Sequence, residues 1–273
     1  MWTASLTSRE AEFTQHALRE LETVTWARPL IKLLNERGGI KEVNKPLLFE
    51  LRIAYEIHCA GAHAEYEYAA EVGNSTIDFR IHTAPEWLVE LVSVQESQAA
   101  KSATVTVGPI SQVTLLSGLD NRDTPSSEDG ELLLLQQKIG EKVFNSGKAV
   151  KFPIPAGKIH LILADTRGFN LGLSDRYDYD LAAQGVSVLP HQVYWRFWNG
   201  KPIKGLFERD NPQRAAALMR ERIHFIGFVR ERKYYAGELQ SLIYLAPNPH
   251  LFPDKAAVQI AYDSFLLKRQ VLT

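Results

Sequence analysis

The hydrophobic pattern of the chain starts with helical spacing and changes to strand alternation after Gly61. Apolar residues recur every three to four positions over residues 7–37 and again over residues 47–60, which is typical of helices buried on one face. Pro29 is expected to divide the first segment into two helices, because proline removes an amide donor and disfavours a helix interior. The N-terminal part is therefore predicted to be helical.

The next segments predict a sheet. Residues 64–73 and 75–82 alternate between apolar and polar side chains, as in half-buried strands, and Gly73-Asn74 between them is a turn signal. Residues 87–95 and 158–168 are nearly continuous apolar runs, which are typical of strands buried on both faces. Residues 131–147 carry a helical pattern between these two strands.

The remaining segments are expected to be mixed. Residues 96–130 are rich in Ser, Thr, Gly and Asp and predict a long surface excursion. Further along the chain, strand pieces are expected at 193–200 and 205–208, a helix at 211–223, a strand pair at 223–231 and 239–249, and a last helix at 254–269. The fold class is therefore α/β, with a mixed central sheet flanked by helices.

Composition places the chain among ordinary globular proteins. Hydrophobic residues make up 45% and charged residues 23% of its 273 positions. The single cysteine, Cys59, excludes an intrachain disulfide framework and favours a reducing compartment. The sequence has neither a secretory leader pattern nor an apolar run long enough to span a membrane. We therefore expect a soluble, cytoplasmic protein with no membrane partner.

The charge balance restricts how this chain could bind nucleic acid. Its formal net charge is −1, whereas proteins that coat nucleic acid through bulk electrostatics are usually clearly basic. Any contact with nucleic acid must therefore come from a local patch. One such patch could be the arginines, lysine and tyrosines between residues 220 and 235, although the same arginines could equally be a solvated flank of a core strand.

Three carboxylates are candidates for a shared site. Asp78 and Glu90 lie on consecutive predicted strands, so a hairpin could bring both to one face of the sheet, and Glu50 on the preceding helix can reach the same end. Three converging carboxylates repel one another unless a cation lies between them, and Mg²⁺ or Mn²⁺ prefers such oxygen ligands. A bound divalent cation would polarise a phosphate oxygen and activate water, as phosphodiester hydrolysis requires.

The stretches FELRIAYEIHCAG, AEYEYAAEVGNSTIDFRI and WLVELVS resemble the PD-(D/E)XK nuclease superfamily over roughly residues 47–168. The resemblance implies a restriction endonuclease-like α-β-β-β-α-β core in which Glu50, Asp78 and Glu90 match the family's metal ligands. It implies a Mg²⁺-dependent nuclease with DNA or RNA as its partner. The implied organisation is an N-terminal helical extension (1–46), the nuclease-like core (47–168) and a C-terminal α+β part packed on it (169–273).

One position departs from the family pattern. Val92 stands where the family has the lysine that orients or activates the attacking water, and valine can do neither. Some family members supply this lysine from the following helix, where Lys138 and Lys142 lie in this chain. Lys138 is the expected substitute, so the predicted catalytic set is Glu50, Asp78, Glu90 and Lys138.

Other interpretations stay open at this stage. Val92 is equally consistent with a binding scaffold for nucleic acid or protein that kept the fold and lost catalysis. Glu50 could be a solvated helix residue and Asp78 a solvent-facing strand residue, whereas the apolar neighbours of Glu90 favour a functional role for it. An unrelated α/β enzyme acting on a small molecule is a third alternative. The sequence leaves the existence of a homo-oligomer open.

Overall fold

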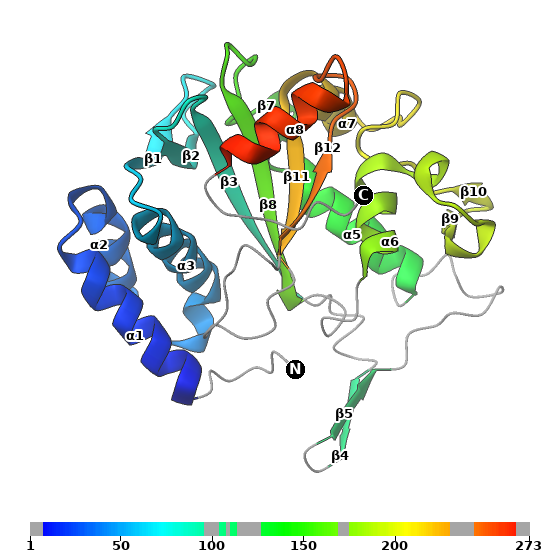
Figure 1. Cartoon of the computed structure of the whole chain (residues 1–273). Helices are drawn as coiled ribbons and strands as arrows, with labels where there is room; N and C mark the ends of the chain where they lie inside the picture. The colour runs from blue at the N-terminus through cyan, green and yellow to red at the C-terminus, as the bar shows by residue number, and fades with distance from the viewer. Residues whose placement is uncertain are drawn as a thin grey trace.

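A computed structural model describes residues 8–95, 104–107, 110–113, 127–168, 175–229 and 243–265. A six-stranded mixed sheet lies at its centre, with helices on both sides, as expected for the α/β class (Figure 1). The strand order across the sheet is β1-β2-β3-β8-β11-β12. These strands are β1 (Ala64–Ala69), β2 (Thr76–Ile81), β3 (Trp87–Gln95), β8 (Ile159–Gly168), β11 (Phe225–Val229) and β12 (Ile243–Pro247).

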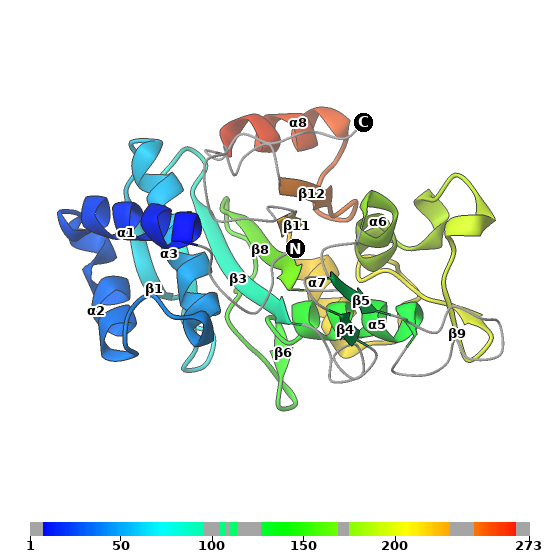
Figure 2. The same cartoon turned by 90° about the horizontal axis from the view of Figure 1, so that it is seen from below.

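The helices cover the two faces of this sheet. Figure 2 shows α1 to α3 on one side and α5 to α7 on the other. The helices are α1 (Ser8–Glu22), α2 (Arg28–Glu36), α3 (Lys45–Cys59), α5 (Glu128–Gly140), α6 (Arg176–Gln184), α7 (Arg214–Arg222) and α8 (Lys255–Ser264). Each face therefore has its own hydrophobic core.

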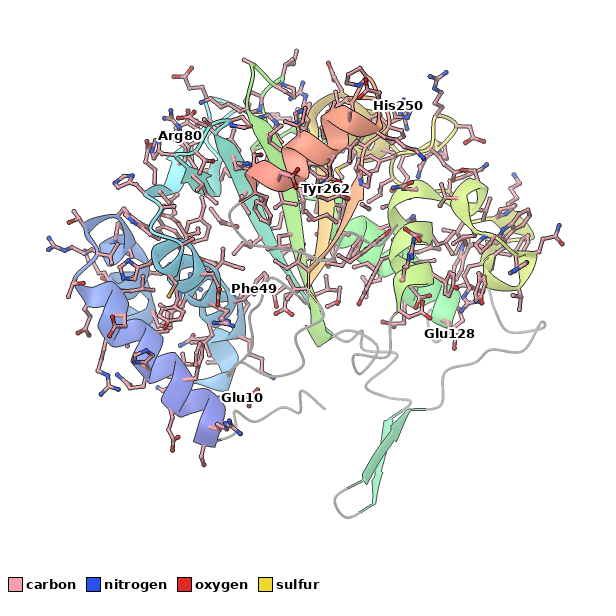
Figure 3. The ribbon with its side chains drawn as sticks, in the orientation of Figure 1. Glu10, Phe49, Arg80, Glu128, His250 and Tyr262 are labelled. Atoms are coloured by element: carbon pink, nitrogen blue, oxygen red, sulfur yellow. The ribbon has the colours of Figure 1, made fainter. Side chains whose placement is uncertain are left out.

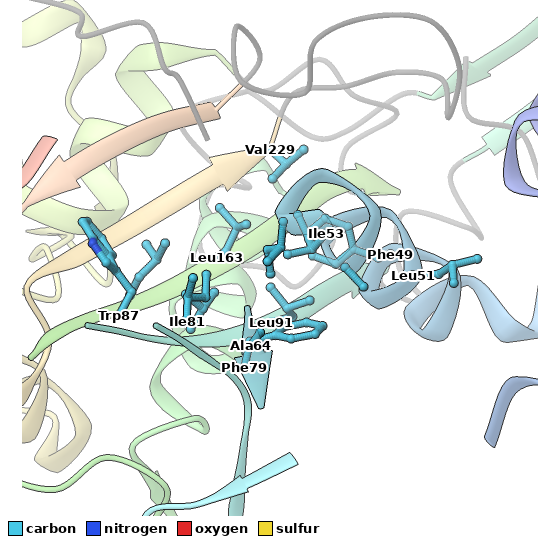
Figure 4. Close-up of a cluster of buried hydrophobic side chains, with 14 of the residues drawn as sticks. Phe49, Leu51, Ile53, Ala64, Phe79, Ile81, Trp87, Leu91, Leu163 and Val229 are labelled. Carbon is cyan, nitrogen blue, oxygen red and sulfur yellow. The ribbon is translucent and has the colours of Figure 1, made fainter. Parts of the chain in front are cut away.

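Alternation along the strands produces these two cores. Phe79 and Leu91 point to the side of α1 to α3, where they pack with Phe49 of α3 (Figure 4). Leu88 and Val92 point to the opposite side and pack with residues of α5 to α7. Because successive side chains of a strand alternate between faces, Glu90 lies on the same face as Leu88 and Val92.

The sheet combines antiparallel and parallel pairs. Strands β1, β2 and β3 form an antiparallel meander, β3 pairs with β8 in parallel, and β8 pairs with β11 in parallel. β12 closes the sheet antiparallel to β11, so the predicted strand pair in the C-terminal part is confirmed. A parallel connection needs a crossover, and the chain between β3 and β8 contains α5 for this purpose.

Several local expectations are confirmed and others are wrong. Pro29 lies in the first turn of α2, so the predicted division of residues 7–37 into two helices is confirmed. The helix expected over 131–147 ends at Gly140, because Ser146 and Gly147 both have positive φ and form the turn of a small hairpin. That hairpin consists of β6 (Phe144–Asn145) and β7 (Lys148–Ala149).

The C-terminal strand pieces are smaller than expected. Residues 197–198 and 201–202 form a two-residue pair, β9 (Phe197–Trp198) with β10 (Lys201–Pro202). The strand expected at 205–208 is wrong, because these residues form a turn whose amides, those of Leu206 and Phe207, donate to carbonyls at the end of α6. The division of the chain at residues 46 and 168 stays a prediction.

The surface excursion expected at 96–130 contains an additional hairpin, β4 (Thr104–Val107) with β5 (Ile110–Val113). Most of the other residues of that segment lie outside the described ranges. Among the helices that the structure describes, none combines the length and apolar character needed to cross a membrane.

Candidate functional site

Asp78 and Glu90 lie at the point where the β2–β3 ladder ends. The last residue pair of this ladder is Phe79 with Val89, and continuing the register places Asp78 opposite Glu90. Here side chains replace main-chain partners: the amide of Leu91 donates to Asp78 Oδ2 at 2.6 Å, and the amide of Asp78 lies 3.4 Å from Glu90 Oε2. The two carboxylates are thus fixed to each other's strand.

Glu50 reaches the same region from α3. Its neighbour Phe49 packs into the core beneath the sheet, which fixes the rotation of the helix at this position (Figures 3 and 4). The hydroxyl of Tyr66 on β1 donates to Glu50 Oε2 at 2.6 Å. The Glu50 carboxylate is therefore held between the helix and the edge strand of the sheet.

Two lysines neutralise Glu90. This carboxylate is fully buried, and its Oε1 atom lies 2.7 Å from the Lys142 ammonium and 2.8 Å from the Lys151 ammonium. Lys142 is in the turn after α5, and Lys151 follows β7. A buried carboxylate in an apolar strand requires such partners, because an unpaired charge there is strongly destabilising.

Lys138, the expected substitute for the missing lysine, has a different partner. Its ammonium lies 3.0 Å from Glu141 Oε2, and its side chain is 43% exposed. It lies one helical turn before Lys142, at the rim of the same pocket. The geometry therefore favours Lys142 over Lys138 as the cation beside the carboxylates, while the catalytic role of Lys138 stays a prediction.

These groups line one pocket of about 330 Å³. The carboxylates Glu50, Asp78 and Glu90 share its wall with Lys142 and Lys151. Val92 also lines it, and so does Ser93, the next residue along β3. The pocket lies toward the C-terminal part of β3, the end of parallel strands at which binding sites of open α/β sheets usually form.

Electrostatics in the pocket reflects an excess of negative charge. Burial raises the pKa of Asp78 well above its usual range, and the nearby carboxylates of Glu90 and Glu50 raise it further. Burial also raises the pKa of Glu50, and the hydrogen bond from Tyr66 opposes this shift. Burial alone would lower the pKa of Lys142, but Glu90 and Asp78 outweigh it, so that this pKa is raised. Additional positive charge would thus be stabilised here.

The chemistry of the oxygen donors suits a hard divalent cation, but each carboxylate is already engaged with protein donors. Glu50 accepts from Tyr66, Asp78 from the Leu91 amide, and Glu90 from two ammonium groups. Within the described ranges, no three His, Cys, Asp or Glu side chains are arranged to share one ion as they stand. A cation at Glu50, Asp78 and Glu90 would therefore have to replace some of these protein contacts.

Two residues of this site were not found from the sequence. Tyr66 lies in an alternating strand segment and has no motif that would single it out, although its position opposite Phe79 follows from the hairpin register. Lys151 is 61 positions after Glu90 (151 − 90), and its approach depends on the β6–β7 hairpin. A contact at this separation has no local sequence signal.

The basic cluster near the C-terminus lies only partly within the described residues. Arg220 donates to the carbonyl of Glu208 and Arg222 to the carbonyl of Phe152, so both take part in internal hydrogen bonds. The residues from 230 to 235 lie outside the described ranges.

Comparison with known proteins does not place this chain in a family. No family model matches it, and neither a curated protein nor a solved structure shows significant similarity to it.

Proposed function

We propose that this protein is a divalent-metal-dependent nuclease that hydrolyses phosphodiester bonds in the pocket formed by Glu50, Asp78 and Glu90. The observation that carries this proposal is that Asp78 and Glu90 lie just beyond the end of the β2–β3 ladder, each beside an amide of the other's strand, with a lysine ammonium 2.7 Å from Glu90. Both the order of elements from α3 to β8 and the resemblance to the PD-(D/E)XK superfamily support it.

The proposal gives each side chain a specific task. The oxygens of Glu50, Asp78 and Glu90 would hold Mg²⁺ or Mn²⁺, and the bound ion would polarise the phosphate and lower the pKa of a water molecule. The Leu91 amide orients Asp78, and Tyr66 orients Glu50. Lys142 supplies the positive charge that Val92 cannot, and it would stabilise negative charge that develops on the phosphoryl oxygens.

A cleavage assay with matched variants tests this proposal. Purified protein should cleave single- or double-stranded DNA or RNA in the presence of Mg²⁺ or Mn²⁺. Asp78→Asn should abolish cleavage, because it removes a ligand charge without changing the size of the side chain. Asp210→Asn is the matched control, since Asp210 is a solvent-exposed partner of Lys204, and it should retain full activity.

The two candidate lysines can be compared in the same assay. Lys142→Met should lower turnover by about 10²–10³-fold, the usual effect of removing one group that stabilises developing charge. Lys138→Met should have a much smaller effect, because its ammonium contacts Glu141 and not Glu90. The reverse ranking would return the catalytic assignment to Lys138. Equal cleavage by wild type and Asp78→Asn would refute the proposed site.

A non-catalytic scaffold is the second candidate function. Its specific support is that two lysines already satisfy Glu90, and that Val92 occupies the position where the superfamily has its lysine. A scaffold would bind nucleic acid or protein without cleaving it, and neither Mg²⁺ nor Mn²⁺ would stabilise it. Absence of both cleavage and a metal-dependent increase in Tm would favour this candidate.

A further inference from the structure

Lys151 has a backbone conformation that is unusual for its residue type. Its φ is +63°, in the left-handed region that side chains other than glycine and asparagine rarely adopt. The Lys151 amide donates to the Ser75 hydroxyl at 2.8 Å, which fixes this conformation. Strained residues of this kind persist where the surrounding structure holds them, and they cluster at functional sites. This backbone conformation places the Lys151 ammonium beside the Glu90 carboxylate.

The hydrogen-bonding capacity of Glu90 Oε1 is used by the two lysines. A carboxylate oxygen offers two lone pairs, and Oε1 has ammonium groups at 2.7 Å and 2.8 Å. A divalent cation binds a carboxylate oxygen at about 2.1 Å and would require one of these lone pairs. Glu90 is fully buried, and both ammonium groups contact Oε1, whereas Oε2 faces the Asp78 amide at 3.4 Å. One ammonium must therefore withdraw before a cation can bind Oε1.

Lys151 is the lysine that can withdraw at lower cost. Its ammonium also donates to the Thr76 carbonyl at 2.9 Å, so it keeps an acceptor after it releases Glu90. Within the described residues, the Lys142 ammonium donates to Glu90 and to no second acceptor, although the two lysine side chains are similarly exposed, at 26% and 21%. Withdrawal of Lys142 would therefore leave its ammonium without a protein acceptor, whereas Lys151 would keep one.

We infer that Lys151 is a built-in counter-ion that competes with the divalent cation for Glu90, so that cation binding displaces the Lys151 ammonium from Oε1. Lys151 is thus a positioning residue that holds the carboxylate in place before a cation arrives. This inference rests on the proposed metal-dependent function. It adds that the affinity of the site for its cation is set by a lysine outside the expected motif.

Titration calorimetry with MnCl₂ and with MgCl₂, in the absence of nucleic acid, tests the inference. Lys151→Met removes the competing charge and keeps a side chain of similar length, so it should lower the Kd for the cation by about tenfold, an effect on the scale of one charge-assisted hydrogen bond. Lys142→Met should give a smaller gain. Lys32→Met is the matched control, because Lys32 is an exposed lysine of α2 paired with Glu36, and it should leave the Kd unchanged.

The outcomes separate this inference from the proposed function. If wild type and Lys151→Met bind the cation equally well, or the variant binds it more weakly, the inference is overturned while the metal site stands. If only Lys151→Met binds, the competition is established and the wild type is a lysine-neutralised scaffold. If neither protein binds Mn²⁺ or Mg²⁺, both the inference and the proposed function are refuted. Thermal melting of each variant without metal verifies that it folds.

Discussion

At the scale of single residues, Asp78 is a source of instability as well as a candidate ligand. Burial and the neighbouring carboxylates raise its pKa, so the folded state prefers the neutral form of this side chain. The ionised form is therefore penalised on folding at pH values above the ordinary range of carboxyl pKa values. Functional groups of this kind are commonly maintained at the expense of stability.

We predict that Asp78→Asn raises Tm by a few degrees at pH 7.5 in buffer containing a chelator. The neutral amide removes the repulsion with Glu90 and Glu50, and 1 kcal/mol corresponds to about 2–4 °C in proteins of about 150–250 residues. The gain should shrink as the pH falls towards 4, because the folded wild type already holds a proton on Asp78 there and the unfolded chain takes one up as well. Thermal melting at a series of pH values would measure it, and a lower Tm for the variant at pH 7.5 would contradict it.

Two buried histidines destabilise the fold in mild acid, an effect opposite in sign to that of Asp78. Burial, reinforced by His224, lowers the pKa of His160 to about 3, and burial lowers the pKa of His224 to about 4. The His160 amide donates to Nδ1 of His224, which requires that nitrogen to be unprotonated. Both rings are therefore neutral in the folded protein at neutral pH.

We predict that the contribution of these two histidines to stability falls as the pH drops below about 6.5, because the histidines of the unfolded chain take up protons there while those of the folded chain stay neutral. The loss is up to about 2 kcal/mol per histidine between pH 7 and pH 5. His224→Asn keeps an acceptor for the His160 amide and removes one titrating group, so its Tm should fall less over this interval. If the Tm of the wild type and that of the variant fall equally between pH 7 and pH 5, His224 is not a source of the loss of stability.

At the scale of elements, the end of α5 controls the position of Lys142. Gly140, the last residue of the helix, packs closely on α7, and a Cβ built there would lie 2.9 Å from the Cβ of Ala215. Lys142 follows two residues later in the turn that leaves the helix. The close contact between the two helices therefore fixes the direction from which the ammonium reaches Glu90.

We predict that Gly140→Ala and Ala215→Gly are coupled. Overpacking typically costs about 1–3 kcal/mol, part of which the better helix propensity of alanine offsets. A double-mutant cycle measured by urea unfolding compares Gly140→Ala in two backgrounds. The substitution should lower the free energy of unfolding by at least about 1 kcal/mol more in the protein that has Ala215 than in the Ala215→Gly variant. Additive effects would mean that the helices separate without strain.

At the scale of the whole molecule, the expectations that depended on periodicity succeeded most often. The alternation around Ile77 and Phe79 predicted β2, and the register of the hairpin then brought Asp78 opposite Glu90. The helix expected over 131–147 was wrong for residues 141–147, since positive φ at Ser146 is not visible in a hydrophobic pattern. Lys151 could not be found, because its approach to Glu90 depends on how separate elements pack.

The parallel pairing of β3 with β8 also determines when the site can form as the chain leaves the ribosome. β3 pairs with β8 through residues 72 positions apart (160 − 88), so this edge of β3 stays open until β8 has been synthesised. Lys142 and Lys151 both precede β8, Lys151 by only eight residues (159 − 151). Glu90 lies opposite Ile162 of β8 in that pairing. Because the chain is synthesised from its N-terminus, Lys142 and Lys151 are both made before β8. The Glu90 carboxylate therefore has both lysines available by the time β8 pairs with β3 and buries it.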